Sequence, residues 1–171
     1  MPIRLSLSLV LLALVGLGAC ATPSATGKLG IPPTVPVRTR TPQPATDEEA
    51  IRQLILLEGQ GLVAQDIEGL MGLWAPDAVV ADAKHTPAST EDDARWQGRD
   101  AIRERYVVLV FPGNPGQAEA KDIQIVIDGD RAIATSTTSI GGETAPGGDR
   151  WAFVKRDGRW WITELTYNLE P

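Results

Sequence analysis

Apolar residues recur every three or four positions between residues 51 and 62, which predicts an amphipathic helix with one buried face. Glu58 lies within that face and is its one charged member. The same spacing predicts a second helix from Asp66 to Trp74 and a third from Gly98 to Tyr106. The first face consists of Ile51, Leu54, Ile55, Glu58 and Leu62.

Polar residues mark where these helices begin and end. Thr46, followed by Asp47, Glu48 and Glu49, forms a capping box in which the threonine oxygen accepts from the Glu49 amide. The acidic first turn also complements the helix dipole. The segment Ala75-Pro76-Asp77 is expected to end the second helix, and residues 78–82 are expected to form a strand.

Alternating apolar and polar residues predict strands in the carboxyl-terminal half. Residues 123–127 alternate and are followed by a turn at 128–130, and residues 132–140 form a strand rich in threonine and serine. Residues 150–156 and 159–167 flank Asp157-Gly158, a strong signal for a two-residue hairpin turn.

The two-residue turn predicts which residues of the hairpin lie opposite one another. Both faces of the hairpin are apolar. One face pairs Val154 with Trp161, Ala152 with Thr163, and Arg150 with Leu165. The other pairs Phe153 with Ile162, Trp151 with Glu164, and Lys155 with Trp160. One face is expected to pack under the helices. The other needs a different cover, and a homodimer is expected through Trp151, Phe153, Trp160 and Ile162.

The first 45 residues have a separate organisation. A positively charged start and an apolar run over 5–17, too short to cross a bilayer, are typical of a secretory signal. Leu17-Gly18-Ala19-Cys20 resembles the lipobox of bacterial lipoproteins, in which the cysteine is acylated and becomes the first residue. The alternative is an ordinary signal or a buried segment in which Cys20 is incidental.

The resulting organisation is a signal peptide over 1–19, a lipidated Cys20 with a proline- and threonine-rich tether over 20–45, and a domain over 46–171. Repeated prolines favour extended backbone, so the tether is expected to be semi-rigid. The protein is expected in the cell envelope, held to a membrane with its domain outside the cytoplasm.

Charge narrows the choice of partners. All 22 acidic residues but only 12 of the 16 basic ones lie in residues 47–171, a net charge of −10. Such a domain repels phosphate backbones, so nucleic acid is not expected as a partner. With one cysteine and one histidine in the chain, no cofactor and no metal site are expected.

Helices followed by strands in about 125 residues indicate an α+β fold, with a curved antiparallel sheet wrapped into a cone around about three helices. Three segments resemble parts of nuclear transport factor 2-like proteins. Residues 66–82 resemble their second helix and first strand, residues 96–103 resemble their third helix, and residues 151–167 resemble their final hairpin. That superfamily has a cystatin-like fold and includes ketosteroid isomerase and the SnoaL-like polyketide cyclases. The resemblance covers roughly residues 46–168.

The resemblance also suggests chemistry. It places Asp82 at the position of the isomerase's general base, although Asp82 could equally cap the following loop. Glu58 and Arg150 fall where the isomerase stabilises an oxyanion, and are expected instead to pair across a pocket. His85 could couple with Asp82 in proton transfer, as in related dehydratases and cyclases, or could lie at the surface.

The expected pocket is apolar with a few polar groups. Its residues are Glu58, Tyr106, Arg150, Trp161, Thr163, Leu165 and Tyr167, which alternatively fill the core. The leading hypothesis is an envelope lipoprotein whose domain binds a small apolar ligand or a partner protein. The alternative is an isomerase, dehydratase or cyclase that uses Asp82 as its base.

Overall fold

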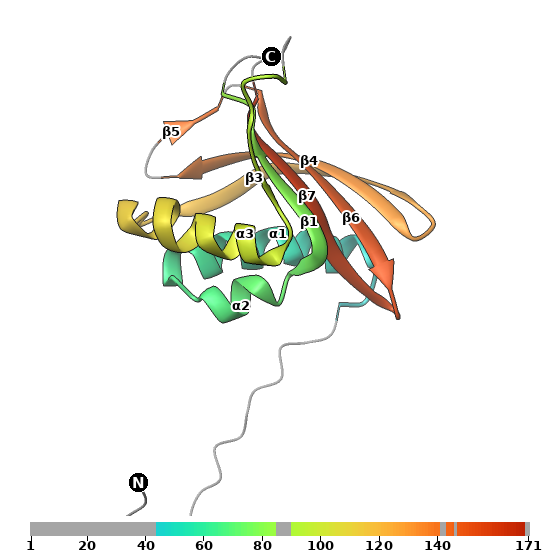
Figure 1. Ribbon diagram of the computed structural model, residues 1–171. Helices are drawn as coiled ribbons and strands as arrows, with labels where there is room; N and C mark the ends of the chain where they lie inside the picture. Colours follow the sequence, from blue (N-terminus) through green and yellow to red (C-terminus); the bar gives the residue numbers. More distant parts are fainter. Residues whose placement is uncertain (1–43, 85–89, 141–142, 146, 170–171) are drawn as a thin grey trace, which may run out of the picture. The chain divides into compact units, whose positions relative to one another are not determined.

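A computed structural model describes residues 44–84, 90–140, 143–145 and 147–169. Three α-helices, α1 (Asp47–Ala64), α2 (Ile67–Met71) and α3 (Arg99–Arg105), lie against a curved sheet (Figure 1). α3 continues into a π-helical turn, η1 (Tyr106–Val110), and a 3-10 turn, η2 (Phe111–Gly113). Among these residues, no helix has the length and apolar character needed to cross a bilayer.

The sheet is mixed, whereas a wholly antiparallel sheet was expected. Along the sheet the strands run β2-β1-β7-β6-β4-β3, and the short β5 pairs with β4. Only β1 and β7 pair in parallel among the strands described, because β7 returns from the hairpin to lie between β1 and β6. The strands are β1 (Trp74–Asp82), β2 (Ala94–Gln97), β3 (Ala118–Asp128), β4 (Arg131–Ile140), β5 (Glu143–Thr144), β6 (Gly148–Arg156) and β7 (Arg159–Leu169).

The three predicted helices are present, but the boundary between the second helix and the following strand differs from the prediction. The Thr46 hydroxyl accepts from the Glu49 amide at 3.1 Å, as the capping box predicts. The second helix already ends at Met71, and β1 begins at Trp74, so Ala75-Pro76-Asp77 belongs to a strand. Pro76 has no N–H to donate, and the pairing of β1 with β7 is irregular between Trp74 and Val79.

The final hairpin has the predicted register near its turn and a different one beyond it. Lys155, Val154 and Phe153 lie opposite Trp160, Trp161 and Ile162, as expected. The register then shifts, so that Ala152 lies opposite Glu164 and Trp151 opposite Leu165. Thr163 is the extra residue of this bulge. An extra residue reverses the inward–outward alternation of everything that follows it.

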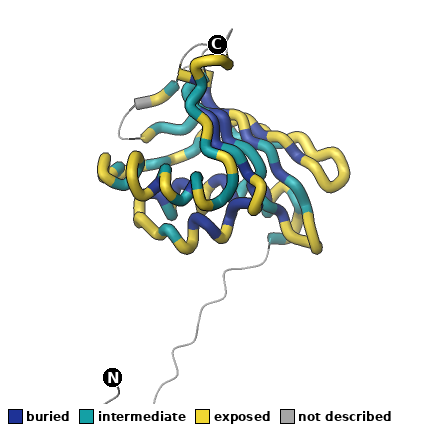
Figure 2. The backbone as a smooth tube through the Cα atoms, viewed as in Figure 1, coloured by how far each residue is buried: buried dark blue, intermediate teal, exposed yellow. Residues whose placement is uncertain are grey.

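This reversal decides which side chains reach the core. Before the bulge Trp160 and Ile162 face the helices, and after it Leu165 does so; all three are buried. Trp151 and Phe153 on β6 are each 2% exposed and belong to the same core. The homodimer prediction through Trp151, Phe153, Trp160 and Ile162 is therefore wrong in its surface, because these side chains are already covered within one chain. Figure 2 shows buried stretches along both the strands and the helices of the domain.

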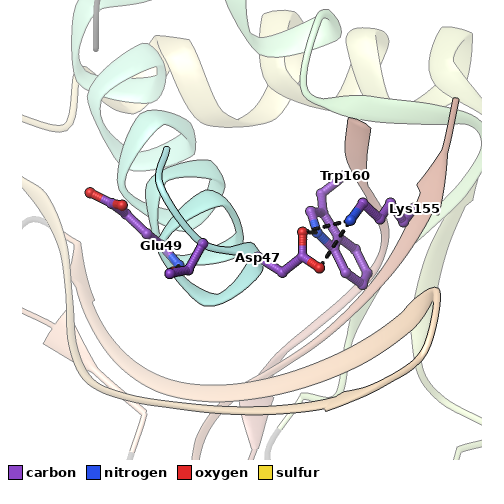
Figure 3. A network of polar contacts seen from close by, with 5 residues as sticks. Asp47, Glu49, Lys155 and Trp160 are labelled. Atoms are coloured by element: carbon purple, nitrogen blue, oxygen red, sulfur yellow. Dashed lines mark hydrogen bonds and ion pairs between the residues drawn. The ribbon is translucent and has the colours of Figure 1, made fainter. Parts of the chain in front are cut away.

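The start of α1 is tied to the same hairpin by polar contacts. The Asp47 carboxylate accepts from Lys155 Nζ at 2.8 and 2.9 Å and from Trp160 Nε1 at 2.9 Å (Figure 3). The Trp160 ring is therefore buried without losing a hydrogen-bond partner for its N–H group. The helix that carries Glu58 is thereby held at its first residue against β6 and β7.

Candidate functional site

A cavity of about 310 Å³ lies between α1, the end of α3 and the strands β4 to β7. Its wall is mainly apolar, with two carboxyl groups and one guanidinium among the lining side chains. The lining residues are Glu58, Leu62, Arg105, Thr138, Ile140, Thr144, Ala145, Asp149, Trp151, Leu165, Tyr167 and Asn168.

Glu58 is the carboxyl that α1 contributes. Its place in the apolar stripe turns it inward, and it is 7% exposed. The Tyr106 hydroxyl donates to Glu58 Oε1 at 2.5 Å, and the Tyr106 side chain is itself fully buried. Burial raises the pKa of the Glu58 carboxyl, because the charged form loses its hydration, while the Tyr106 hydrogen bond opposes this rise.

Asp149 is the second carboxyl and comes from the start of β6. It is 6% exposed, and its Oδ2 accepts from the Ser136 hydroxyl at 3.3 Å. Trp151 Nε1 in turn donates to Ser136 Oγ at 2.9 Å, so a short chain of hydrogen bonds orients the serine. Burial raises the pKa of Asp149, and the Thr138 and Ser136 hydroxyls oppose this rise.

Asp149 faces inward because it alternates along β6 with Trp151 and Phe153, which are both buried. Gly148 has φ +71°, a conformation that side chains disfavour, and a Cβ there would collide with the Ser136 carbonyl oxygen. The glycine therefore lets β6 begin in close contact with β4. The pairing of β6 with β7 also shifts between Gly148 and Arg150.

Arg105 supplies the positive charge of the cavity wall. Its guanidinium carbon lies 4.8 Å from the Tyr167 ring centroid, 5.1 Å from that of Trp96 and 5.5 Å from that of Tyr106. These cation–π contacts hold the side chain against aromatic rings at the end of α3. Burial raises the pKa of Tyr167, and the charge of Arg105 opposes this effect.

The predicted pocket is brought together only in part. Glu58, Leu165 and Tyr167 line the cavity, and Tyr106 supports Glu58 from behind. Trp161 and Thr163 are not among the lining residues: Trp161 precedes the bulge and stacks against Arg159, whose guanidinium carbon lies 4.0 Å from its ring centroid. Simple alternation along β7 predicted that Trp161, Thr163, Leu165 and Tyr167 share one face. The bulge places the first two on the opposite face from the last two.

The expected pair between Glu58 and Arg150 does not form. Arg150 is exposed, because its neighbour Trp151 points inward and alternate residues of a strand point to opposite faces. The partner of Glu58 is the Tyr106 hydroxyl. Asp149, one residue before Arg150, takes the inward position, because it shares the face of Trp151 and Phe153, which the sequence analysis assigned to a homodimer instead of the interior.

Asp82 does not line the cavity. Its Oδ1 accepts from Asn168 Nδ2 at 2.8 Å and from the Lys84 amide at 3.0 Å, contacts that close the loop after β1. Tyr167 and Asn168 line the cavity next to it on the paired strand. The geometry matches the loop-capping alternative. His85 and Cys20 lie outside the described residues.

Within the described ranges, no three histidine, cysteine or acidic side chains come together as metal ligands. The cavity is thus a compartment with two carboxyls, a tyrosine hydroxyl behind one of them and a guanidinium. Such an arrangement can hold a small apolar body and hydrogen-bond its polar end, and the carboxyls can exchange protons with it.

Comparison with known proteins defines the class. A family model described as a SnoaL-like domain matches residues 58–162, which is more than half of the chain. The chain therefore belongs to the SnoaL-like family. This agrees with the expected resemblance to nuclear transport factor 2-like proteins. A comparison with curated proteins gives no match.

Solved structures show the same fold at low identity. A nuclear transport factor 2-like protein with a cystatin-like fold from Novosphingobium aromaticivorans has a TM-score of 0.56 and 22% identity, covering 70% of this chain and 79% of that chain. A cystatin-like protein of unknown function from Nostoc punctiforme has a TM-score of 0.58 and 15% identity, covering 72% and 91%. A Streptomyces avermitilis protein, named as a candidate dehydratase, has a TM-score of 0.52 and 22% identity, covering 72% and 96%.

Proposed function

We propose that this protein is an envelope lipoprotein whose SnoaL-like domain binds a small, mostly apolar molecule. The observation that carries the proposal is the cavity of about 310 Å³, which has an apolar wall and two buried carboxyls. Ligand sites typically combine an apolar lining with a few polar groups that orient the ligand, and begin at about 300 Å³. The cavity matches both criteria.

The polar groups lie where they can orient a ligand. Glu58 and Asp149 come from different elements, α1 and β6, and each accepts a hydrogen bond from a hydroxyl. Leu62, Trp151 and Leu165 lie among the apolar residues of the lining. A ligand would bury its apolar body against these side chains and turn its polar end to the carboxyls.

Native mass spectrometry of the full chain, purified from membranes in a mild detergent, tests this function. We expect a co-purifying small molecule that is lost in Ala145→Phe, because the phenyl ring would fill the cavity that Ala145 lines. Ala64→Phe, at the exposed end of α1, is the matched control and should retain the molecule. A ligand that survives Ala145→Phe in a folded protein would place binding elsewhere.

A second candidate function is proton transfer of the isomerase, dehydratase or cyclase type. It is favoured by the buried Asp149 carboxyl, whose pKa is raised by burial and which lines the cavity. In this version Asp149 takes the role that the resemblance to ketosteroid isomerase suggested for Asp82.

Deuterium incorporation into cyclohexanone in D₂O, followed by mass spectrometry, tests this candidate without knowledge of the substrate. We expect Asp149→Asn to abolish protein-dependent exchange and Asp82→Asn to preserve it. Loss of exchange in Asp82→Asn alone would return the base to Asp82. Absence of exchange in the unmodified chain would count against proton transfer from ketones in this cavity.

A further inference from the structure

The charged groups that face the cavity are unequal in number. Among the described residues of the lining, Glu58 from α1 and Asp149 from β6 are acidic, and Arg105 from α3 is the one basic side chain. Tyr106 and Tyr167 are the phenols next to these groups, and Asp82 lies behind Tyr167. Because Arg105 is stacked against three aromatic rings, its charge is already engaged at the wall. The cavity as a whole is acidic.

The two carboxyls have acceptor capacity that their neighbours do not fill. An ionised carboxylate offers about four lone-pair positions and no donor. Glu58 receives the Tyr106 hydroxyl, and Asp149 receives the Ser136 hydroxyl at the long distance of 3.3 Å. The Thr138 hydroxyl and amide also lie close to Asp149 and stabilise its charged form. The polar end of the cavity therefore suits a ligand with several donors.

Charge separates the possible classes of ligand. A carboxylate or phosphate would be repelled by Glu58 and Asp149, whose charges already oppose one another. A neutral alcohol offers one donor for two acceptors. A protonated amine offers up to three donors and a charge of the opposite sign, and the rings of Trp151 and Tyr167 in the lining can add cation–π attraction.

Resting on the proposed binding function, we infer that the cavity takes a compact apolar molecule with a protonated amine, whose ammonium group donates to Asp149 and Glu58. The apolar body lies against Leu62, Trp151 and Leu165. The positive charge of Arg105 disfavours an ammonium group beside it, so the ammonium group is expected to lie nearer the carboxyls.

Three probes of matched shape test the class: 2-phenylethylamine, 2-phenylethanol and phenylacetate. Binding is measured by titration calorimetry on the full chain in phosphocholine nanodiscs, with empty nanodiscs subtracted. At about pH 8 we expect the amine to bind about tenfold or more tightly than the alcohol, and phenylacetate to bind weakest. Lowering the pH to about 5 should weaken amine binding, since the carboxyls take up protons, and should leave alcohol binding unchanged.

Variants assign the preference to the two carboxyls. Asp149→Asn and Glu58→Gln should each reduce the amine-to-alcohol ratio by about tenfold while the alcohol still binds. Asp130→Asn and Glu104→Gln change exposed acids and should leave the ratio unchanged. Equal binding of amine and alcohol, or an unchanged ratio in Asp149→Asn and Glu58→Gln, would overturn the amine assignment alone. Failure of all three probes, together with no co-purifying molecule, would overturn the binding function itself.

Discussion

At the scale of single residues, Glu58 and Asp149 are the side chains whose burial is energetically unfavourable in this domain. Each carboxyl is more than nine-tenths buried, and burial raises the pKa of both. A buried acid with few donors is less stable in its charged form than the same acid in water. A ligand that donates hydrogen bonds to these carboxyls, as proposed above, would offset this cost.

The raised pKa of Glu58 leads to a prediction about stability. As pH rises above about 4.3, the unfolded chain releases the Glu58 proton before the folded protein does, so the free energy of unfolding falls until pH passes the folded pKa. Glu58→Gln removes this loss. The free energy of unfolding of the original chain minus that of Glu58→Gln should therefore decrease from pH 4 to pH 7 in urea titrations.

The free energy of unfolding is compared between the two proteins because other acids also change it with pH. Asp47, Glu68 and Asp77 have lowered pKa values and therefore make the folded state more stable as pH rises at lower pH, and this contribution cancels in the difference. Glu104→Gln, at an exposed position of α3, is the control and should give a nearly constant difference. Parallel pH profiles for the original chain and Glu58→Gln would contradict the prediction.

At the scale of elements, the final hairpin decides the interior. Its turn and first three pairs follow from Asp157-Gly158 and alternation, and these were predicted correctly. The bulge at Thr163 then reverses the faces of β7. Alternation cannot reveal such an extra residue when both faces of a strand are apolar, since either register buries hydrophobic side chains.

The observed inner and outer faces of the sheet predict a large loss of stability for one substitution and a small change for another. Phe153→Ala should lower the free energy of unfolding by roughly 3–5 kcal/mol, because Phe153 is 2% exposed and its removal leaves a cavity. Ile133→Ala, where the side chain is 56% exposed, should change it by less than about 1 kcal/mol. Urea unfolding followed by tryptophan fluorescence measures both, and similar losses for the two variants would contradict this assignment of faces.

At the scale of the whole molecule, the amino-terminal segment and the domain have separate roles in the proposed function. The SnoaL-like domain contains the cavity, and the proposed acylation at Cys20 holds the chain at a membrane. Several acyl chains on one residue give stable anchoring where one chain gives marginal binding. The domain's net charge of −10 over residues 47–171 would keep it from adhering to anionic headgroups.

Substitution of Cys20 tests the anchor. Cys20→Ser removes the thiol that carries the lipid, so incorporation of an alkyne-labelled palmitate should be lost and the signal should remain uncleaved. Thr22→Ser, two residues further on, is a matched control and should leave labelling intact. Palmitate labelling that persists in Cys20→Ser would contradict the lipoprotein assignment.

The sequence by itself determined the α+β class, three helices, the capping of α1 and the inward position of Glu58, because these depend on periodicities and local hydrogen bonds within a few residues. Only the tertiary structure decided which hairpin face is interior, that β1 and β7 pair in parallel, and that Asp149 rather than Arg150 faces the cavity. Those outcomes depend on which strands pair and on the bulge at Thr163, and both appear only when strands distant in the sequence come together.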